Sequence, residues 1–300
     1  MSNSGGHKSF ILLIAVVAIV FFSAKAVFVK MAYAYDIEAV PLLLLRMAFS
    51  LPVYLIIAFM KKPSRPKEIH VKDYFSVIFL GFIGYYLASL TDFLGLEFIK
   101  ASLERIILFI YPTLVILITW IFLGKRPSKW QIVAIATSYA GILITFSAEL
   151  EFSVNRDDVF IGGLLVFLSA LFYASYLVGS DWLIPKFGSV AFTSYAMIVS
   201  SLFVFIHFGF TQSLNLLDYP IEVYSLAFGM AMVSTVIPSY LVSISIKHLG
   251  ASTFSILGSL GPISTIVLAN IFLEERLTIL QIFGAMIVIG AVLIVTRGKN

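Results

Sequence analysis

The sequence predicts an all-α integral membrane protein with ten transmembrane helices, arranged as two inverted five-helix repeats. Three observations lead to this prediction. Of the 300 residues, 60% are hydrophobic and only 12% are charged, which is too little charge to cover the surface of a water-soluble protein. The apolar residues form runs that are long enough to cross a bilayer. The chain also matches itself at a constant offset of 150 residues, with the charge of matching loops reversed.

Ten apolar runs predict the transmembrane helices. A helix needs about 20 apolar residues to cross the hydrocarbon core of a bilayer. Backbone groups in lipid must bond within their own segment, which favours helices over open strands. Residues 106–123 and 277–296, for example, contain no charged side chain. In chain order, the predicted spans are 10–33, 40–60, 74–96, 102–123, 130–147, 159–180, 190–210, 223–246, 252–273 and 278–296.

The internal repeat is clearest in the second part of each half. Segments 101–147 and 251–297 share 13 identities without a gap, and Pro112 is matched by Pro262. The sequence therefore predicts a first repeat at 1–150 and a second at 151–300, each with five spans. Because five is an odd number, the second repeat must enter the membrane from the opposite side.

The distribution of lysine and arginine agrees with an inverted repeat. The loops at 61–72 and 125–129 are rich in both residues, whereas the matching loops at 211–222 and 275–279 together hold only Arg276. Basic loops remain on the cytoplasmic side of a membrane. We therefore expect a multi-pass protein of the plasma membrane, which is the inner membrane in a bacterium. Both termini are expected to be cytoplasmic.

Two features resemble a known family. The stretch FFSAKAVFVKMAY at 21–33 is followed by Pro41 and Arg46, and the apolar runs that end in IFLGKR and IFLEER each precede a glutamine and a helix rich in Gly and Ala. The chain resembles the EamA type of the drug/metabolite transporter (DMT) superfamily over nearly its whole length. The resemblance implies a ten-helix transporter and does not specify a substrate.

The inverted repeat itself also favours transport, because two similar halves give two states that open to opposite sides. We expect a secondary active or facilitative transporter that moves a small organic metabolite by alternating access. Two alternatives remain open, namely a multidrug or amine exporter with Asp92 or Glu104 as its cation site, and a membrane scaffold or sensor that does not transport.

No enzyme motif is apparent, and the sequence contains no Walker loop for ATP. Cysteine is absent and the four histidines are scattered, so no metal site and no cofactor are expected. The expected partners are a small-molecule substrate and the lipid bilayer. Protons are a further candidate, and no nucleic acid is expected.

Charged residues within the predicted spans are candidates for the site, because charge is costly in a bilayer. Lys25 and Asp92 are candidates to line a cavity or to pair with each other. Arg46 is a candidate to contact substrate, or to tie the second helix to a neighbour. The surplus of positive charge mildly favours an anionic substrate. The full set is Lys25, Lys30, Arg46, Asp92, Glu104 and Arg105.

Prolines and polar side chains extend this candidate site. Pro112 and Pro262 each remove a backbone hydrogen bond and favour a helix break, and matched breaks in two halves indicate a binding site near the midplane. Tyr85, Ser89 and Asp92 share one helix face. Tyrosines would accommodate an aromatic substrate, whereas single serines can also serve close helix packing. The remaining candidates are Tyr111, Tyr173, Tyr176, Ser239, Ser255 and Ser259.

Overall fold

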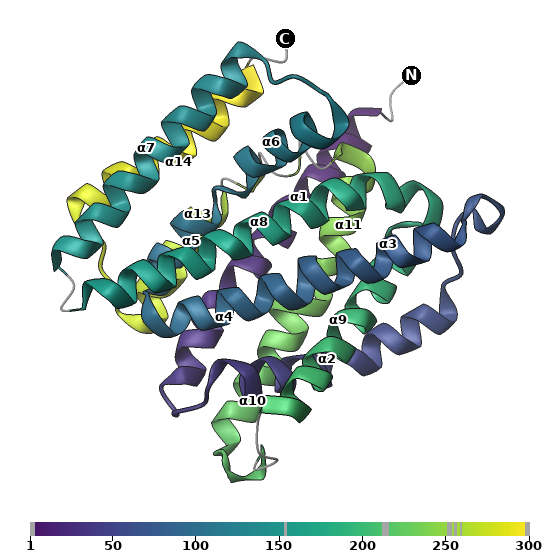
Figure 1. The fold of residues 1–300 in the computed structure, drawn as a ribbon, viewed down its shortest axis with the longest axis horizontal. Coiled ribbons are helices and arrows are strands. Elements are labelled where there is room, and N and C mark those ends of the chain that lie inside the picture. Colours follow the sequence, from purple (N-terminus) through teal and green to yellow (C-terminus); the bar gives the residue numbers. More distant parts are fainter. Residues whose placement is uncertain are drawn as a thin grey trace.

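The computed structural model describes residues 4–152, 155–211, 216–250, 254, 257, 258 and 260–297, and all of the regular structure in these residues is helical (Figure 1). The helices of the first half are α1 (Ser4–Tyr33), α2 (Ala39–Met60), α3 (Val71–Gly81), α4 (Ala88–Phe98), α5 (Ala101–Leu108), α6 (Tyr111–Leu123) and α7 (Lys129–Phe152). Those of the second half are α8 (Arg156–Phe187), α9 (Ser189–Thr211), α10 (Ile221–Ala231), α11 (Ile237–Leu249), α13 (Leu260–Leu273) and α14 (Ile279–Arg297). Short 3₁₀ turns lie at Pro66–Glu68 and Leu216–Asp218.

These helices correspond to the predicted transmembrane spans. Within the described residues, eight segments are long and apolar enough to cross a membrane, and two shorter apolar helices, Leu260–Leu273 and Ile279–Ala291, correspond to the ninth and tenth predicted spans. The predicted third span comprises α3, a π-helical segment at Phe82–Leu87 and α4. The eighth span comprises α10, a π-helical segment at Met232–Val236 and α11. The fold is therefore an all-α membrane fold of two five-helix halves.

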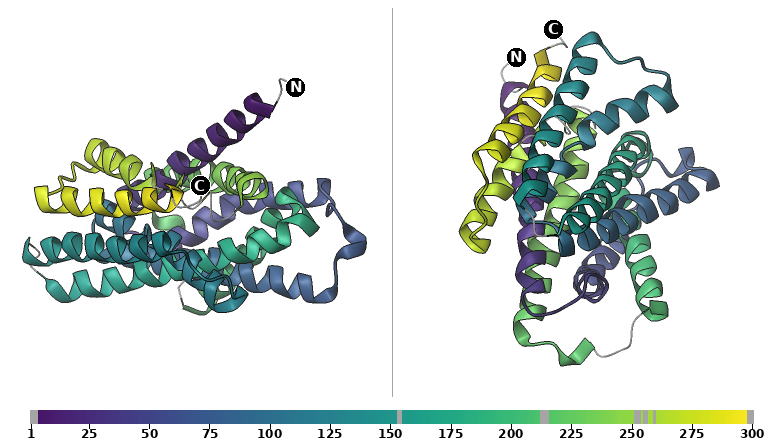
Figure 2. Two further views of the ribbon diagram at one scale, coloured as in Figure 1. Left: turned by 90° about the horizontal axis from the view of Figure 1, so that it is seen from above. Right: turned by 60° about the vertical axis from the view of Figure 1, so that its left-hand side comes forward.

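Contacts between the halves repeat with the two halves exchanged. Helix α8 packs against α3, α4 and α6, while its counterpart α1 packs against α10, α11 and α13. The counterparts α2 and α9 pack against each other. So do α7 and α14, which lie side by side at one edge (Figures 1 and 2). These last two helices approach closely, because a Cβ added to Gly141 would lie 2.7 Å from the carbonyl oxygen of Gly284.

The chain ends and the turns agree with an inverted arrangement. The start of α1 and the end of α14 lie at the same edge of the molecule (Figure 1), as an even number of spans requires. The turn that ends α6 has Gly124 at φ 67°, and the matching turn in the second half has Glu274 at φ 56°. A left-handed conformation is easy for glycine and unfavourable for glutamate. The turn is therefore kept in both halves despite the change of residue.

Polar contacts hold the helix ends together at two loops that lie on opposite sides of the bundle. After α2, Ser64 and Arg65 donate backbone hydrogen bonds to the carbonyl oxygens of Phe187 and Lys186. The Lys186 ammonium lies 2.7 Å from an Asp73 carboxylate oxygen. After α13, the Glu275 carboxylate accepts hydrogen bonds from the backbone N–H groups of Ala101 and Ser102, at 2.9 and 3.0 Å, and so caps α5. Seven spans separate these loops, so the bundle is tied together on both faces of the membrane.

Candidate functional site

A small cavity lies between the two halves. Its volume is about 30 Å³, which is room for only a few water molecules. Helices α1, α2, α5 and α8 contribute to its wall, together with both π-helical segments and the first residues of α4 and α11. The lining residues are Phe22, Lys25, Arg46, Gly84, Tyr85, Ala88, Ser89, Leu108, Ser169, Tyr173, Ser234, Thr235 and Ser239.

The two halves line this cavity with matching positions. At the offset of 150 residues, Ser89 of the first half corresponds to Ser239 of the second. Gly84 and Tyr85 correspond in the same way to Ser234 and Thr235. All of these residues lie within or directly after the π-helical segments. An inserted π-turn interrupts the regular helical bonding and is often found at functional sites. Thr235 shows the altered register, because its hydroxyl donates to the carbonyl oxygen of Met230, five residues earlier.

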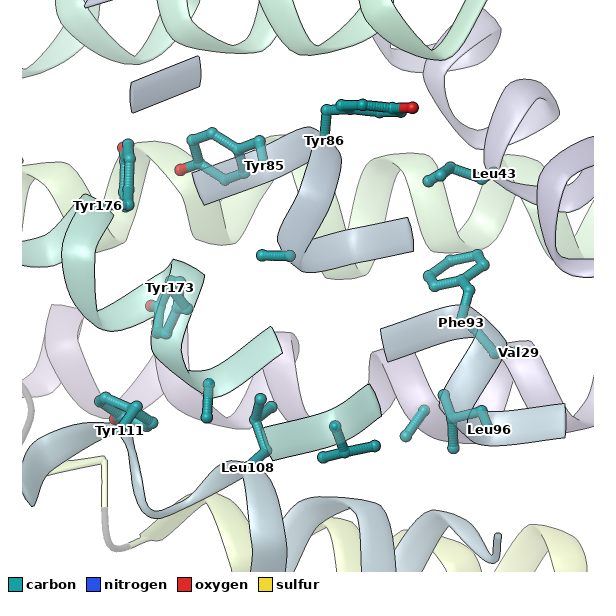
Figure 3. Close-up of a cluster of buried hydrophobic side chains, with 14 of the residues drawn as sticks. Val29, Leu43, Tyr85, Tyr86, Phe93, Leu96, Leu108, Tyr111, Tyr173 and Tyr176 are labelled. Atoms are coloured by element: carbon teal, nitrogen blue, oxygen red, sulfur yellow. The ribbon is translucent and has the colours of Figure 1, made fainter. Parts of the chain in front are cut away.

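Gly84 allows α8 to approach the first π-helical segment. A Cβ added to Gly84 would lie 2.2 Å from the Cβ of Tyr176, closer than any side chain could tolerate. The approach brings Tyr176 to a ring distance of 4.6 Å from Tyr85. The series of rings continues from Tyr176 to Tyr173 at 6.4 Å and from Tyr173 to Tyr111 at 5.2 Å (Figure 3). A row of buried tyrosines therefore lies beside the cavity.

A buried ion pair joins α1 to α4. The Lys25 ammonium lies 2.6 Å from an Asp92 carboxylate oxygen, and the Asp92 side chain is fully buried. Glu104 of α5 is fully buried as well, and Asp92 and Lys25 are among the charged groups that act on it electrostatically. Neither carboxylate oxygen of Glu104 has a hydrogen-bond partner among the described residues.

Two buried arginines lie close to this pair. Arg105 donates to the Ser23 hydroxyl at 3.0 Å, and its guanidinium lies 5.5 Å from the centre of the Phe22 ring. The Lys25 ammonium lies 5.2 Å from the same ring. Arg46 donates from Nη2 to the Ser89 hydroxyl at 2.8 Å and lies 4.9 Å from the Phe93 ring centre. The aromatic faces stabilise these cations without neutralising them.

A second cavity of about 20 Å³ lies next to the first. Phe22, Leu108 and Tyr173 line both cavities and therefore separate them. The Phe22 and Tyr173 rings stack at 5.7 Å across this partition. The second cavity is further lined by Ala18, Ile19, Arg105, Tyr111, Val242 and Phe254.

The prolines lie beside this second cavity. Span four is broken at Phe109 and Ile110, and Pro112 lies in the first turn of α6, where a missing N–H leaves no hydrogen bond unmade. Pro262 lies in the first turn of α13. In the first half, the break thus precedes the proline, whereas the sequence suggested a break at it.

The structure divides the sequence-predicted site residues into three groups. Lys25, Arg46, Tyr85, Ser89, Tyr173 and Ser239 line the first cavity, and Arg105, Tyr111 and Tyr173 line the second. Asp92, Glu104 and Tyr176 are buried behind the lining residues. Ser255 and Ser259 lie outside the described residues.

Sequence reasoning missed several lining residues, among them Phe22, Gly84, Ser169, Ser234 and Thr235. The internal repeat holds a signal for one of them, Thr235. Ser234 and Thr235 stand at the positions that match Gly84 and Tyr85. Once Tyr85 was a candidate, its counterpart in the second half was one too. Phe22 and Ser169 carry no such signal, because aromatic and small residues are frequent throughout the spans.

Comparisons with known proteins agree with this architecture. The family model described as the EamA-like transporter family matches residues 9–147 and again residues 160–297. The uncharacterized transporter YcbK of Bacillus subtilis is 30% identical over 286 residues, which cover 93% of this chain and 89% of that protein. The uncharacterized transporter YyaM of the same organism is 24% identical, over 83% of this chain and 81% of that protein. One crystal structure has a similar fold, with a TM-score of 0.69 at 14% identity, and the match covers 97% of this chain and 99% of that chain.

Proposed function

The chain belongs to the EamA-like transporter family of the drug/metabolite transporter superfamily, and from this premise we propose that it moves a small organic metabolite by alternating access. It is a multi-pass membrane transporter. The proposed mechanism is secondary active or facilitative, with the central cavity as the substrate site. The observation that carries the proposal is the cavity lined by matching positions of two inverted halves. An exchange of roles between such halves opens the site first to one side and then to the other.

The size of the cavity supports a closed conformation between two open ones. Ligand pockets of proteins commonly measure about 300–1,000 Å³, whereas this cavity measures about 30 Å³. An organic substrate therefore requires the walls to move apart. The thin partition of Phe22, Leu108 and Tyr173 is the part that we expect to move, because its movement would join the two cavities into one.

The buried carboxyl groups support coupling to protons. Asp92 has Lys25 as its counter-ion, and Glu104 lies beside Asp92. Two carboxylates that interact inside a protein repel each other when both are ionised, which favours a proton on one of them. A proton taken up here on one side of the membrane and released on the other would couple transport to a pH gradient. Substrate exchange and facilitated diffusion are the mechanisms that remain if the carboxyl groups keep their protonation state.

A second candidate function is export of amines or multiple drugs. The specific observation in its favour is the fully buried Glu104 carboxyl group, since no Lys or Arg of the described residues lies within 4 Å of it. A cationic substrate would supply that counter-charge. We favour a neutral or anionic substrate, because Glu104 does not line the cavity whereas Lys25 and Arg46 do.

The proposal includes the division of the chain and its orientation. We assign the first repeat to 1–150 and the second to 151–300, in agreement with the two matched segments 9–147 and 160–297. Both termini are proposed to face the cytoplasm, because the basic loops 61–72 and 125–129 then lie inside. The plasma membrane of a bacterium is the proposed location, and bacterial relatives support it.

Flux measurements in proteoliposomes test the proposed function. Vesicles that contain the purified protein should take up at least one solute of a metabolite panel faster than protein-free vesicles. An imposed pH gradient should drive accumulation of that solute. Asp92→Asn and Glu104→Gln should lose this accumulation and keep exchange. Protein-dependent flux of no solute in a broad panel of acids, amines and neutral metabolites would contradict transport. Full accumulation by both variants would exclude only the coupling to protons.

A further inference from the structure

Arg46 is a buried cation that faces the cavity without a counter-ion. The residue is 3% exposed and lines the first cavity. Its guanidinium donates one hydrogen bond, to the Ser89 hydroxyl, and its Nε has no partner among the described residues. No carboxylate of the described residues lies within 4 Å of it. The Arg46 charge is held by the Ser89 hydroxyl and the Phe93 ring and by no carboxylate of the described residues within 4 Å, so it can bind an anionic ligand.

Of the other two cations of the site, one has a counter-ion and the other lines a different cavity. Lys25 is neutralised by Asp92 at 2.6 Å. Arg105 is held by the Ser23 hydroxyl and faces the second cavity. In the first cavity, Arg46 is therefore the residue whose charge is left for a ligand. A guanidinium binds a carboxylate through two parallel hydrogen bonds. The Nε of Arg46 is buried and has no partner among the described residues, so it becomes available for such a pair when the walls of the cavity move apart.

The hydroxyl groups of the wall restrict the ligand further. Each of four side chains already donates its hydrogen to a backbone carbonyl oxygen. These are Ser169 to Ala88 at 2.7 Å, Ser234 to Met230 at 2.9 Å, Thr235 to Met230 at 3.0 Å and Ser239 to Val236 at 2.8 Å. A hydroxyl oxygen that has donated its hydrogen retains only its capacity to accept. These four hydroxyl groups therefore offer acceptors, and a ligand that bonds to them must bring donors. The Ser239 oxygen already accepts from the Tyr54 hydroxyl at 2.9 Å and keeps one lone pair for a ligand.

We propose that the substrate is a small carboxylate that also carries an O–H or N–H donor, and that Arg46 binds its carboxylate. The proposal rests on the proposed function, since it assigns the substrate class of the same cavity. The donor group of the ligand bonds to the hydroxyl oxygens contributed by the second half. Phe22, Tyr85 and Tyr173 pack against the carbon skeleton. Arg46 and the hydroxyl groups lie on different halves of the chain, so bound substrate links the two halves.

Ligand-dependent thermal stability of the purified full chain tests this proposal with four probes of one carbon skeleton. The probes are phenyllactate, phenylalanine, 3-phenylpropanoate and phenyllactamide. Phenyllactate or phenylalanine should raise the Tm in a saturable manner, because each combines a carboxylate with a donor. The donor-free acid 3-phenylpropanoate should bind more weakly, and the uncharged phenyllactamide should not bind. The comparison of phenyllactate with phenylalanine identifies the preferred donor as O–H or N–H.

Variants separate a binding role of Arg46 from a structural one. Arg46→Gln should weaken the response about 10- to 100-fold, as expected for loss of a charged hydrogen-bond pair worth about 1.5–3 kcal/mol. Arg46→Lys keeps the buried charge and the fold but loses the fork, and it should bind with intermediate affinity. Ser239→Ala should lose the preference for the probe with a donor. Lys186→Gln serves as the control, because its pair with Asp73 lies far along α8 from the cavity residues Ser169 and Tyr173, and its response should equal that of the wild type.

Several results would overturn the proposal. One is an unchanged probe affinity in both Arg46 variants, which would make Arg46 a tie between α2 and α4. Another is equal binding of the acid and its amide. A third is the lack of any response to the acids in the wild type. Each of these leaves the proposed function standing if proteoliposomes still show flux of another solute, whereas loss of all flux would remove the proposed function itself.

Discussion

At the scale of single residues, six charged side chains of the described residues are buried, namely Lys25, Arg46, Asp73, Asp92, Glu104 and Arg105. The most direct prediction concerns Lys25 and Asp92, which are 2.6 Å apart. Lys25→Ala leaves the Asp92 charge without its counter-ion and should lower the free energy of unfolding by about 3–5 kcal/mol. Asp92→Ala should cost less, because Glu104 lies beside Asp92 and offers Lys25 a second carboxyl group. The double variant should recover much of the lost stability. Unfolding in denaturing detergent measures the stability of the wild type, the two single variants and the double variant. A coupling free energy near zero would refute the pair.

Most of these charges were visible in the sequence because charge is rare inside apolar runs. Lys25, Arg46 and Asp92 could each be selected by that rule alone. What the sequence could not give is the partner of each charge, since this depends on how α1, α2, α4 and α5 pack. Lys30 illustrates the point. The sequence marks it only as a charge within a span, and the structure has its ammonium donating to the carbonyl oxygen of Leu96 at 2.8 Å.

At the scale of elements, the two π-helical segments shape the cavity, and Gly84 is the residue that permits the first of them to pack. Gly84→Ala would place a methyl group within 2.2 Å of the Tyr176 side chain. We expect a loss of about 1–3 kcal/mol from overpacking and a shift of α8 away from the cavity. Gly209→Ala is the matched control, because nothing lies within 4 Å of a Cβ there, and alanine is the better helix former by about 1 kcal/mol. Detergent unfolding of both variants gives the comparison, and equal stability of the two would contradict this role for Gly84.

The cap of α5 gives a second prediction at this scale. Glu275 accepts from the backbone N–H groups of Ala101 and Ser102, and also from the Ser102 hydroxyl at 2.6 Å. Glu275→Ala should lower the free energy of unfolding by about 0.5–2 kcal/mol, the usual cost of a lost N-cap. Lys125 occupies the matching position of the first half and is exposed, so Lys125→Ala should change stability by less than half as much. A larger loss of stability in Lys125→Ala than in Glu275→Ala would show that the cap is unimportant.

The sequence pattern did not predict the π-helical segments or the position of the break in the fourth span. The π-helical segments have no periodicity of their own, because one extra residue in a turn leaves the run of apolar side chains intact. The third and eighth spans therefore read as single helices. The fourth span was predicted to bend at Pro112, and its break falls at Phe109 and Ile110 instead. A proline is accommodated more easily in the first turn of a new helix than in the middle of a continuous one.

At the scale of the whole molecule, the repeat determined most of what the sequence could predict. The matched loops IFLGKR and IFLEER differ in charge because they face opposite sides, and the turn that they share is kept at Gly124 and Glu274. At the same offset, Ser239 corresponds to Ser89, and both residues line the cavity. The number of spans came from the apolar runs, whereas the inverted pairing of the halves and the proposal of a site between them follow from the repeat. The small volume of the cavity could not be predicted, because one sequence is compatible with more than one state of a transporter.

The orientation of the whole molecule is tested by single cysteines, for which the absence of native cysteine is an advantage. Cysteines at Lys67 and Lys125 should be shielded from an impermeant thiol reagent in intact cells. Cysteines at Asp157 and Asp218 should react. All four positions are exposed, so a lack of reaction reports the side of the membrane and not burial. Reaction at position 67 from outside would reverse the orientation.

Alternating access is the central claim, and the accessibility of one cavity residue from both sides tests it most directly. Ser234 is 1% exposed and lines the cavity. Among the described residues, its hydroxyl bonds only to the carbonyl oxygen of Met230, four residues earlier in the same span. A cysteine at this position should react with the impermeant reagent in right-side-out vesicles and also in inside-out vesicles, at rates that a transported substrate alters in both. The control cysteine at Asp157 should react from one side only. Reaction of the Ser234 position from a single side under every condition, with substrate present or absent, would contradict the account.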